Sequence, residues 1–240
     1  MSKLFILTFF TICLFGSCNF NDGKKVKGNN NRTSQQRTVS SFTGIEFVGD
    51  MNVFYTSGSN FSITVEGDEN LLEYIETTVS GNTLNISTRK HFNLQSSSPI
   101  KVYITAPTLD DISMVGGGDF VTQSPIVSNN NLKIEAVGNG NLKAAIDAPQ
   151  IKIEITGNGD LQLSGKTKIF DAEIMGSGGI KCFELLSEQT KIGISGSGDA
   201  QVYASKQLDV EINGSGSVAY KGSPAVSQNV SGSGSVRKAE

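Results

Sequence analysis

Three aspartates stand at the same place in a repeated motif, and their spacing suggests a site for a cation. Asp119, Asp160 and Asp199 each follow the second glycine of a Gly-x-Gly motif, and Asn141 holds that place in the copy between the first two. If the copies stack as neighbouring strands about 4.8 Å apart, their side-chain oxygens form a line that Ca²⁺ could bridge. The alternative is a solvated polar ladder without a metal. We favour the ladder, because calcium-binding glycine repeats are denser than this one.

Other residues that could carry chemistry are few. The single histidine, His91, lies outside the motifs in a Lys-His-Phe segment and is predicted to be a surface residue. Cys182 falls on the apolar phase of its segment, so it is predicted to be a buried core residue and not a nucleophile. The sequence has no phosphate-binding loop, no Cys/His metal spacing and no nucleophile elbow. We therefore predict no catalytic residue and no cofactor.

The Gly-x-Gly motif itself is the strongest structural signal. Its seven copies begin 18 to 22 residues apart, and apolar and polar residues alternate strictly on both sides of each copy. Alternation of this kind predicts half-buried strands. Both glycines fall on the inward phase, which predicts a strand that continues through them where the backbone approaches another part of the core or adopts a positive φ. The copies begin at Gly116, Gly138, Gly157, Gly176, Gly196, Gly214 and Gly232.

A repeat of this length without helices is too short for a strand-helix-strand unit and suits one coil of a parallel β-helix. We predict an all-β fold, a right-handed parallel β-helix-like solenoid of about seven to eight short coils, with residues 111–238 forming the repeats. The alternative is an antiparallel sandwich, because Gly-Ser-Gly and Gly-Asn-Gly also resemble hairpin turns. The unbroken alternation favours the solenoid.

Residues 42–110 show the same alternation in a less regular form. Between Ile45 and Tyr55 the pattern repeats with Met51 in place of the second glycine, which predicts a degenerate coil. A helix capped by Asp68 is expected to run to Thr77, followed by strands at 83–88 and 101–106. This segment is predicted to be an N-terminal cap that protects the open end of the solenoid.

The first residues are typical of an export signal. Lys3 precedes an apolar run from Leu4 to Phe15, which is about half the ~20 residues that a membrane-spanning helix needs. Residues 1–17 are therefore predicted to be a signal peptide. The small residues at 16 and 17 before Cys18 resemble bacterial lipoprotein signals, which implies that Cys18 is the acylated first residue of the mature protein. The alternative is an ordinary secretory signal with an incidental cysteine.

The segment after Cys18 is polar and basic. Residues 18–41 are rich in Asn, Ser, Gln and Lys, and are predicted to be a flexible tether. Asn19 stands where an aspartate marks inner-membrane retention in familiar lipoproteins. An outer-membrane lipoprotein, periplasmic or surface-facing, is therefore expected.

Several short motifs resemble a known family. They are Ser195-Gly196-Ser197-Gly198, Asn213-Gly214-Ser215-Gly216 and Ser231-Gly232-Ser233-Gly234, with Ala106-Pro107-Thr108-Leu109 before the first repeat and Tyr220-Lys221-Gly222-Ser223-Pro224 before the last. Over about residues 42–238 the chain resembles the so-called putative auto-transporter adhesin head GIN domain. The resemblance implies an exported bacterial protein with a β-helix-like fold, and it supplies no catalytic residues.

Composition limits the function classes. The net charge is −3, 18% of the residues are charged and there is no Trp, so no basic field for nucleic acid is present. We predict a membrane-anchored, non-enzymatic module for adhesion, binding or envelope structure, with a glycan or protein as its unidentified ligand. The alternative is a carbohydrate-active β-helix enzyme, a polysaccharide lyase or hydrolase, whose only possible nucleus is the line Asp119, Asn141 and Asp160.

Overall fold

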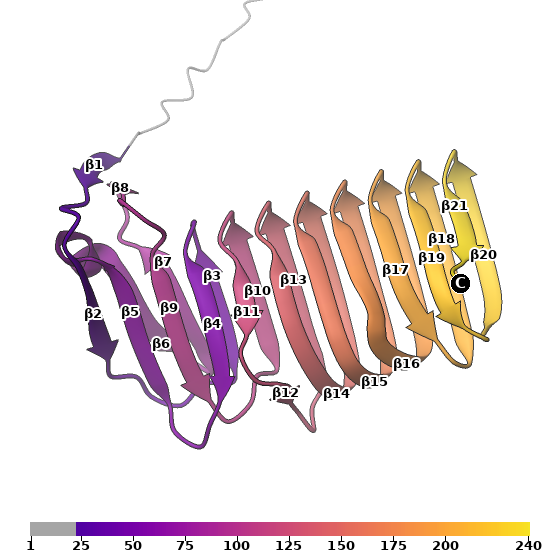
Figure 1. Ribbon diagram of the computed structural model, residues 1–240, viewed down its shortest axis with the longest axis horizontal. Helices are drawn as coiled ribbons and strands as arrows, with labels where there is room; N and C mark the ends of the chain where they lie inside the picture. The colour runs from indigo at the N-terminus through magenta and orange to yellow at the C-terminus, as the bar shows by residue number, and fades with distance from the viewer. Residues whose placement is uncertain (1–22) are drawn as a thin grey trace, which may run out of the picture.

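A computed structural model of the chain describes residues 23–240. The predicted signal peptide and Cys18 lie outside the described residues. From residue 23 onward the chain is mostly β-strand and winds into a long, flat solenoid of about seven turns (Figure 1). In this part of the chain no helix is long and apolar enough to span a membrane. The predicted all-β solenoid is confirmed.

The strands cover two broad faces, because each coil runs up one face and down the other (Figure 1). Three long strands bend from one face to the other, so that one continuous 19-stranded sheet results. These are β14 (Leu142–Gly157), β15 (Asp160–Gly176) and β16 (Gly179–Gly196). The first face also contains β6 (Ile75–Ser80), β7 (Thr83–Thr88), β3 (Gly44–Val48), β10 (Asp111–Gly116), β13 (Leu132–Gly138), β18 (Gln207–Gly214) and β20 (Ala225–Gly232).

The second face begins at the same end of the molecule. Most of its strands pair in parallel, and β5 pairs antiparallel with both of its neighbours. The short β12 (Ile126–Val127) pairs with β14 near the corner opposite the Gly-x-Gly motifs. The second face contains β2 (Arg32–Arg37), β5 (Ser62–Asp68), β9 (Lys101–Ala106), β4 (Asn52–Ser57), β11 (Phe120–Thr122), β17 (Asp199–Ala204), β19 (Ser217–Gly222) and β21 (Ser235–Lys238).

The parallel register stacks identical phases of the repeat on each other. Ile134, Ile153 and Ala172 are paired neighbours on successive coils, and all three are buried. Between them, side chains such as Lys152 point outward. Each coil thus adds one layer of Ile, Leu, Val or Ala to a single core, and burial of this apolar surface stabilises the column.

The Gly-x-Gly motifs form the sharp corners at one edge of the solenoid. From β10 onward, each strand of the first face ends at the first glycine of its motif, whose φ is positive, for example +122° at Gly138 and +127° at Gly157. The prediction of a strand that continues through both glycines is therefore wrong, because the backbone bends here and a new strand begins on the second face. The predicted close approach is real, since a Cβ at Gly157 would lie 2.2 Å from the carbonyl oxygen of Gly138.

The N-terminal coils do not stack in sequence order. Strand β3 lies between β7 and β10, so the coil made by β7 and β9 is outermost although it comes later in the chain. Beyond it, β5 and β6 pair antiparallel with β9 and β7 and extend both faces by one strand. The predicted strands at 83–88 and 101–106 are confirmed as β7 and β9.

The predicted short helix is confirmed, although it ends three residues earlier than expected. A single 3-10 helix, η1 (Glu69–Tyr74), crosses from β5 to β6 and buries Leu71 and Leu72 over the end of the core. Asp68 makes no side-chain capping bond, because its carboxylate binds another segment, and Ile75 already begins β6.

Part of the predicted tether is also structured. Strand β1 (Lys24–Lys27) pairs in parallel with β8 (Phe92–Gln95), and β2 pairs antiparallel with β5. The prediction of a flexible tether over residues 18–41 is therefore wrong for these two strands. Their polar composition is that of exposed edge strands, which hold their place by backbone hydrogen bonds and gain little from apolar burial.

Candidate functional site

The predicted metal residues lie along one line at the Gly-x-Gly edge. Strand register places Asn52, Asp119, Asn141, Asp160, Gly179, Asp199 and Ser217 on successive coils. We call this line the corner ladder. The predicted alignment of Asp119, Asn141 and Asp160 is therefore present, whereas Gly179 separates Asp160 from Asp199.

The side chains of the corner ladder bind backbone N–H groups of the next coil. Oδ1 of Asp119 accepts hydrogen bonds from the backbone N and from Nδ2 of Asn141, both at 3.0 Å. Oδ1 of Asn141 in turn accepts from the backbone N of Asp160 at 3.2 Å, and Oδ1 of Asp199 accepts from that of Ser217 at 3.1 Å. These bonds satisfy N–H groups at the corner, where the strand is interrupted.

This arrangement gives the oxygens a structural role. Oδ2 of Asp160 also accepts from Nζ of Lys181 at 2.7 Å, which places a cation of the protein where a metal would sit. Within residues 23–240, no group of three or more His, Cys, Asp or Glu side chains is arranged to hold a metal ion.

We expect the melting temperature to be the same, within about 1 °C, in millimolar Ca²⁺ and in EDTA. A site with a Kd of about 0.1 mM would add roughly 1.4 kcal/mol at about 1 mM Ca²⁺, a shift of several degrees for a domain of this size. Differential scanning calorimetry measures the shift. A rise of several degrees with Ca²⁺ that Asp119→Asn abolishes would contradict the structural role.

A cleft lies at the N-terminal end of the corner ladder. It has a volume of about 940 Å³ and opens between the corners at 49–52 and 117–119 on one side and residues 92–100 on the other. Its lining is mixed: the polar side chains are Asp50, Asn52, Thr88, Asn93, Ser96, Ser97, Ser98 and Asp119, and the apolar ones are Met51, Phe92, Leu94, Pro99 and Ile100.

The polar side chains on the corner side are held in place by the next coil. Oδ1 of Asp50 accepts from the backbone N of Gly117 at 3.1 Å, and Oδ1 of Asn52 accepts from that of Asp119 at 3.3 Å. Within the described chain, Oδ2 of Asp50, Oδ2 of Asp119 and Nδ2 of Asn52 have no other hydrogen-bond partner. Two acceptors and one donor on a fixed backbone are therefore available to bind a ligand in the cleft.

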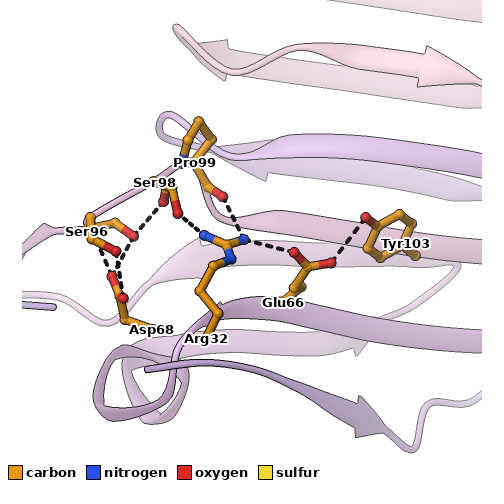
Figure 2. A network of polar contacts seen from close by, with 8 residues as sticks. Arg32, Glu66, Asp68, Ser96, Ser98, Pro99 and Tyr103 are labelled. Atoms are coloured by element: carbon orange, nitrogen blue, oxygen red, sulfur yellow. Dashed lines mark hydrogen bonds and ion pairs between the residues drawn. The ribbon is translucent and has the colours of Figure 1, made fainter. Parts of the chain in front are cut away.

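A buried carboxylate fixes the opposite wall. Asp68 is 0% exposed and accepts hydrogen bonds from the backbone N of Ser97 at 2.8 Å, from Oγ of Ser97 at 2.7 Å and from Oγ of Ser96 at 3.0 Å (Figure 2). These bonds, led by the backbone N–H of Ser97, hold the pKa of Asp68 below its ordinary value. The serine run is thereby tied to β5.

An arginine continues the same network. Arg32 binds the Ser98 hydroxyl, the carbonyl of Pro99 at 3.3 Å and Oε1 of Glu66 at 2.8 Å, while the Tyr103 hydroxyl donates to Glu66 at 3.1 Å (Figure 2). The hydrogen bond from Arg32 is the largest cause that lowers the pKa of Glu66. Both sides of the cleft are therefore preorganised, the corner side by bonds between adjacent coils and the serine side by bonds to Arg32, Glu66 and Asp68.

The remaining sequence candidates lie where they were predicted. Cys182 is 0% exposed, and burial raises the pKa of its thiol to about 12, which leaves no thiolate for nucleophilic attack at neutral pH. His91 is exposed in a turn, with a φ of +68°. Neither residue lines the cleft.

The cleft itself was not predicted from the sequence. Its main lining segments, residues 49–52, 92–100 and 117–119, are separated by 39 and 16 residues of sequence. Only the run Ser96-Ser97-Ser98-Pro99, a polar stretch inside an alternating region, is a local signal.

Comparisons with known proteins agree with the fold. The chain is similar to a "putative adhesin" from Bacteroides fragilis, with 27% identity, a TM-score of 0.85, and coverage of 89% of this chain and 100% of that one. It is similar to a "putative lipid binding protein" from Parabacteroides distasonis, with 27% identity, a TM-score of 0.76, and coverage of 90% and 100%. A "putative adhesin" from Parabacteroides distasonis, at 24% identity, TM-score 0.72 and coverage of 90% and 100%, shares the fold.

No curated protein matches the chain. A family model described as "Putative auto-transporter adhesin, head GIN domain" matches residues 41–224, well over half of the sequence. The chain therefore belongs to the family described as putative auto-transporter adhesin, head GIN domain.

Proposed function

We propose that this protein is an exported lipoprotein, anchored at the outer membrane through acylated Cys18, whose solenoid is a non-enzymatic binding module of the adhesin type. The observation that supports the binding role is the cleft of about 940 Å³ with two preorganised walls. Its size is within the range of ~300–1,000 Å³ that ligand sites occupy, and its lining combines apolar surface with a few fixed polar groups.

The polar groups of the cleft support binding over catalysis. Asp50 and Asp119 are two carboxylates in one cleft, which is the minimum that a glycoside hydrolase requires. Each of them, however, holds a backbone N–H of the next coil, exactly as Asn141 and Asp199 do away from the cleft. Their positions are therefore explained by the fold, without a catalytic role.

A turnover assay separates the two functions. The full chain is incubated with neutral and anionic polysaccharides, and new reducing ends or unsaturated products are measured. We expect none above the background of a heat-denatured sample. Product formation that Asp119→Asn abolishes would replace the proposal by a carbohydrate-active enzyme.

Anchoring is tested in cells that express the protein. Wild type is expected in the membrane fraction and labelled by a radioactive fatty acid, while Cys18→Ser is expected to be unlabelled and released from the membrane. Protease added to intact cells then shows whether the domain faces outward. Equal labelling of both forms, or no labelling of either, would overturn the lipid anchor.

A further inference from the structure

The cleft is one of two hollows on the same edge of the solenoid. The second, of about 270 Å³, lies further along the corner ladder and is lined by Asp160, Gly179, Lys181 and Asp199 among others. It exists because Gly179 occupies a ladder position where other coils carry a side chain. A Cβ there would lie 2.5 Å from Oδ1 of Asp160, so the carboxylate leans over the vacant place.

The corner ladder joins the two hollows without a gap. Asp119 lines the first hollow and Asp160 the second, and Asn141 lies on the coil between them. Since coils stack about 4.8 Å apart, the distance from Asp119 to Gly179 along the ladder is about 14 Å. A ligand that reaches both hollows must therefore be extended, and it must bind polar side chains that recur at regular intervals along the corner ladder, which we call the track.

The chemistry of the track selects among extended ligands. The lining of the first hollow has two carboxylates, two Asn amides and no Lys, Arg or His, which disfavours an anionic chain. In the second hollow, Lys181 is paired with Asp160. Carboxylate acceptors beside amide donors match hydroxyl groups, each of which donates and accepts. The half-buried side chains of Phe92 and Leu94 offer an apolar surface to the C–H faces of sugar rings.

We propose that the corner ladder binds an uncharged linear saccharide chain, which is seated in the cleft at one end and in the hollow over Gly179 at the other. This inference rests on the proposed binding function and names its ligand class and its track. The sugar lies along the edge of the solenoid, across successive coils, and Asp119, Asn141 and Asp160 contact successive parts of it.

The first test uses oligosaccharides of increasing length. The full chain in detergent is titrated by calorimetry with linear N-acetylglucosamine and β-linked glucose oligomers of about two to six units. We expect affinity to rise at least tenfold between the shortest and the longest members of one series, because longer chains reach the second hollow. No binding of any member at millimolar concentration, with the protein folded by circular dichroism, would overturn the saccharide proposal.

Two variants then separate the hollows. Asn93→Arg places a bulky cation in the cleft at an exposed residue whose side chain makes no hydrogen bond in the described chain, and we expect at least tenfold weaker binding of short and long oligomers. Gly179→Asn restores a ladder side chain and fills the second hollow, so it is expected to weaken only the long oligomers. The matched control is Asn213→Arg, an exposed asparagine that lines neither hollow, and it is expected to bind as wild type.

Two further outcomes would overturn the proposed saccharide track. Equal binding by wild type and Asn93→Arg would place the ligand elsewhere and overturn the track. Binding of phosphatidylcholine vesicles in place of oligosaccharides would also overturn it, although the proposed non-enzymatic binding function would stand. That function fails only in the separate turnover and anchoring assays.

Discussion

Gly157→Ala is expected to destabilise the solenoid by about 3–5 kcal/mol, which is near the upper end for a single substitution. Two effects act together. The φ of Gly157 is +127°, a conformation that costs an L-residue about 1–3 kcal/mol. In addition, the new Cβ would lie 2.2 Å from the carbonyl oxygen of Gly138, which is backbone and cannot rotate away.

The clash cannot be relieved by a local shift. Gly138 is itself stacked on Gly116, because a Cβ at Gly138 would lie 2.4 Å from the carbonyl oxygen of Gly116. Gly176 is stacked on Gly157 in the same way. Movement of one corner therefore requires movement of its neighbours, and in a solenoid each coil is stabilised only by the coils beside it. Urea unfolding followed by circular dichroism measures the loss.

Gly193→Ala is the matched control, two strands away along the same face. Gly193 lies within β16 with an ordinary strand φ, and the nearest atom to its added Cβ is Cγ of Glu173 at 3.8 Å. We expect a change within about 1 kcal/mol, because alanine fits this strand position and restricts the unfolded chain. Equal losses for both variants would show that any glycine replacement is harmful and that the corner geometry is not the cause.

The alternation of apolar and polar residues made the coils predictable, because a parallel register repeats the same burial pattern on every turn. The corner at the glycines was not predictable, because a glycine on the inward phase is compatible with both a continuing strand and a bend. The order of the first coils was also out of reach. The segments from Gly44 to Ser57 and from Thr83 to Ala106 have the same alternation, and their stacking order depends on long-range pairing.

The alternation of the repeats predicted the corner ladder as a line of oxygens, but it did not predict that these oxygens bind backbone N–H groups of the next coil. Whether a carboxylate at Asp119 meets a cation or a backbone N–H depends on which N–H groups the bend leaves unpaired. The sequence allowed a bend with positive φ at the glycines but did not decide between it and a continuing strand. The cleft depends on three segments brought together by the outermost coils. The buried role of Asp68 was likewise hidden, because an acidic residue before Leu71 and Leu72 is indistinguishable in sequence from a helix cap.

Asp68→Asn is expected to destabilise the N-terminal end by about 3 kcal/mol at neutral pH. The carboxylate is fully buried and accepts three hydrogen bonds from Ser96 and Ser97, whereas an amide would present a donor to some of those donors. Bonds to a buried charge are worth about 1.5–3 kcal/mol each, and an unsatisfied buried donor adds a further penalty. Hydrogen exchange at residues 96–100 and urea unfolding measure the effect.

Asp171→Asn is the control for loss of a carboxylate. Asp171 lies on the outward side of β15 and its side chain makes no hydrogen bond within the described chain, so a change within about 0.5 kcal/mol is expected. If both variants lose equal stability, the effect is one of net charge and not of the Asp68 network. Faster exchange confined to residues 96–100 in Asp68→Asn would connect the loss to the wall of the cleft.

The same carboxylate predicts how stability depends on pH. Since the pKa of Asp68 is lower in the folded protein than its ordinary value of 3.8, the unfolded chain binds the proton more tightly, and acid favours unfolding. The stabilisation from Asp68 is fully present above about pH 4 and is lost as the pH falls through the lowered folded pKa. The difference in unfolding free energy between wild type and Asp68→Asn should therefore shrink below pH 4. A difference that stayed constant down to pH 2 would show that the amide, and not the loss of the charge, causes the instability.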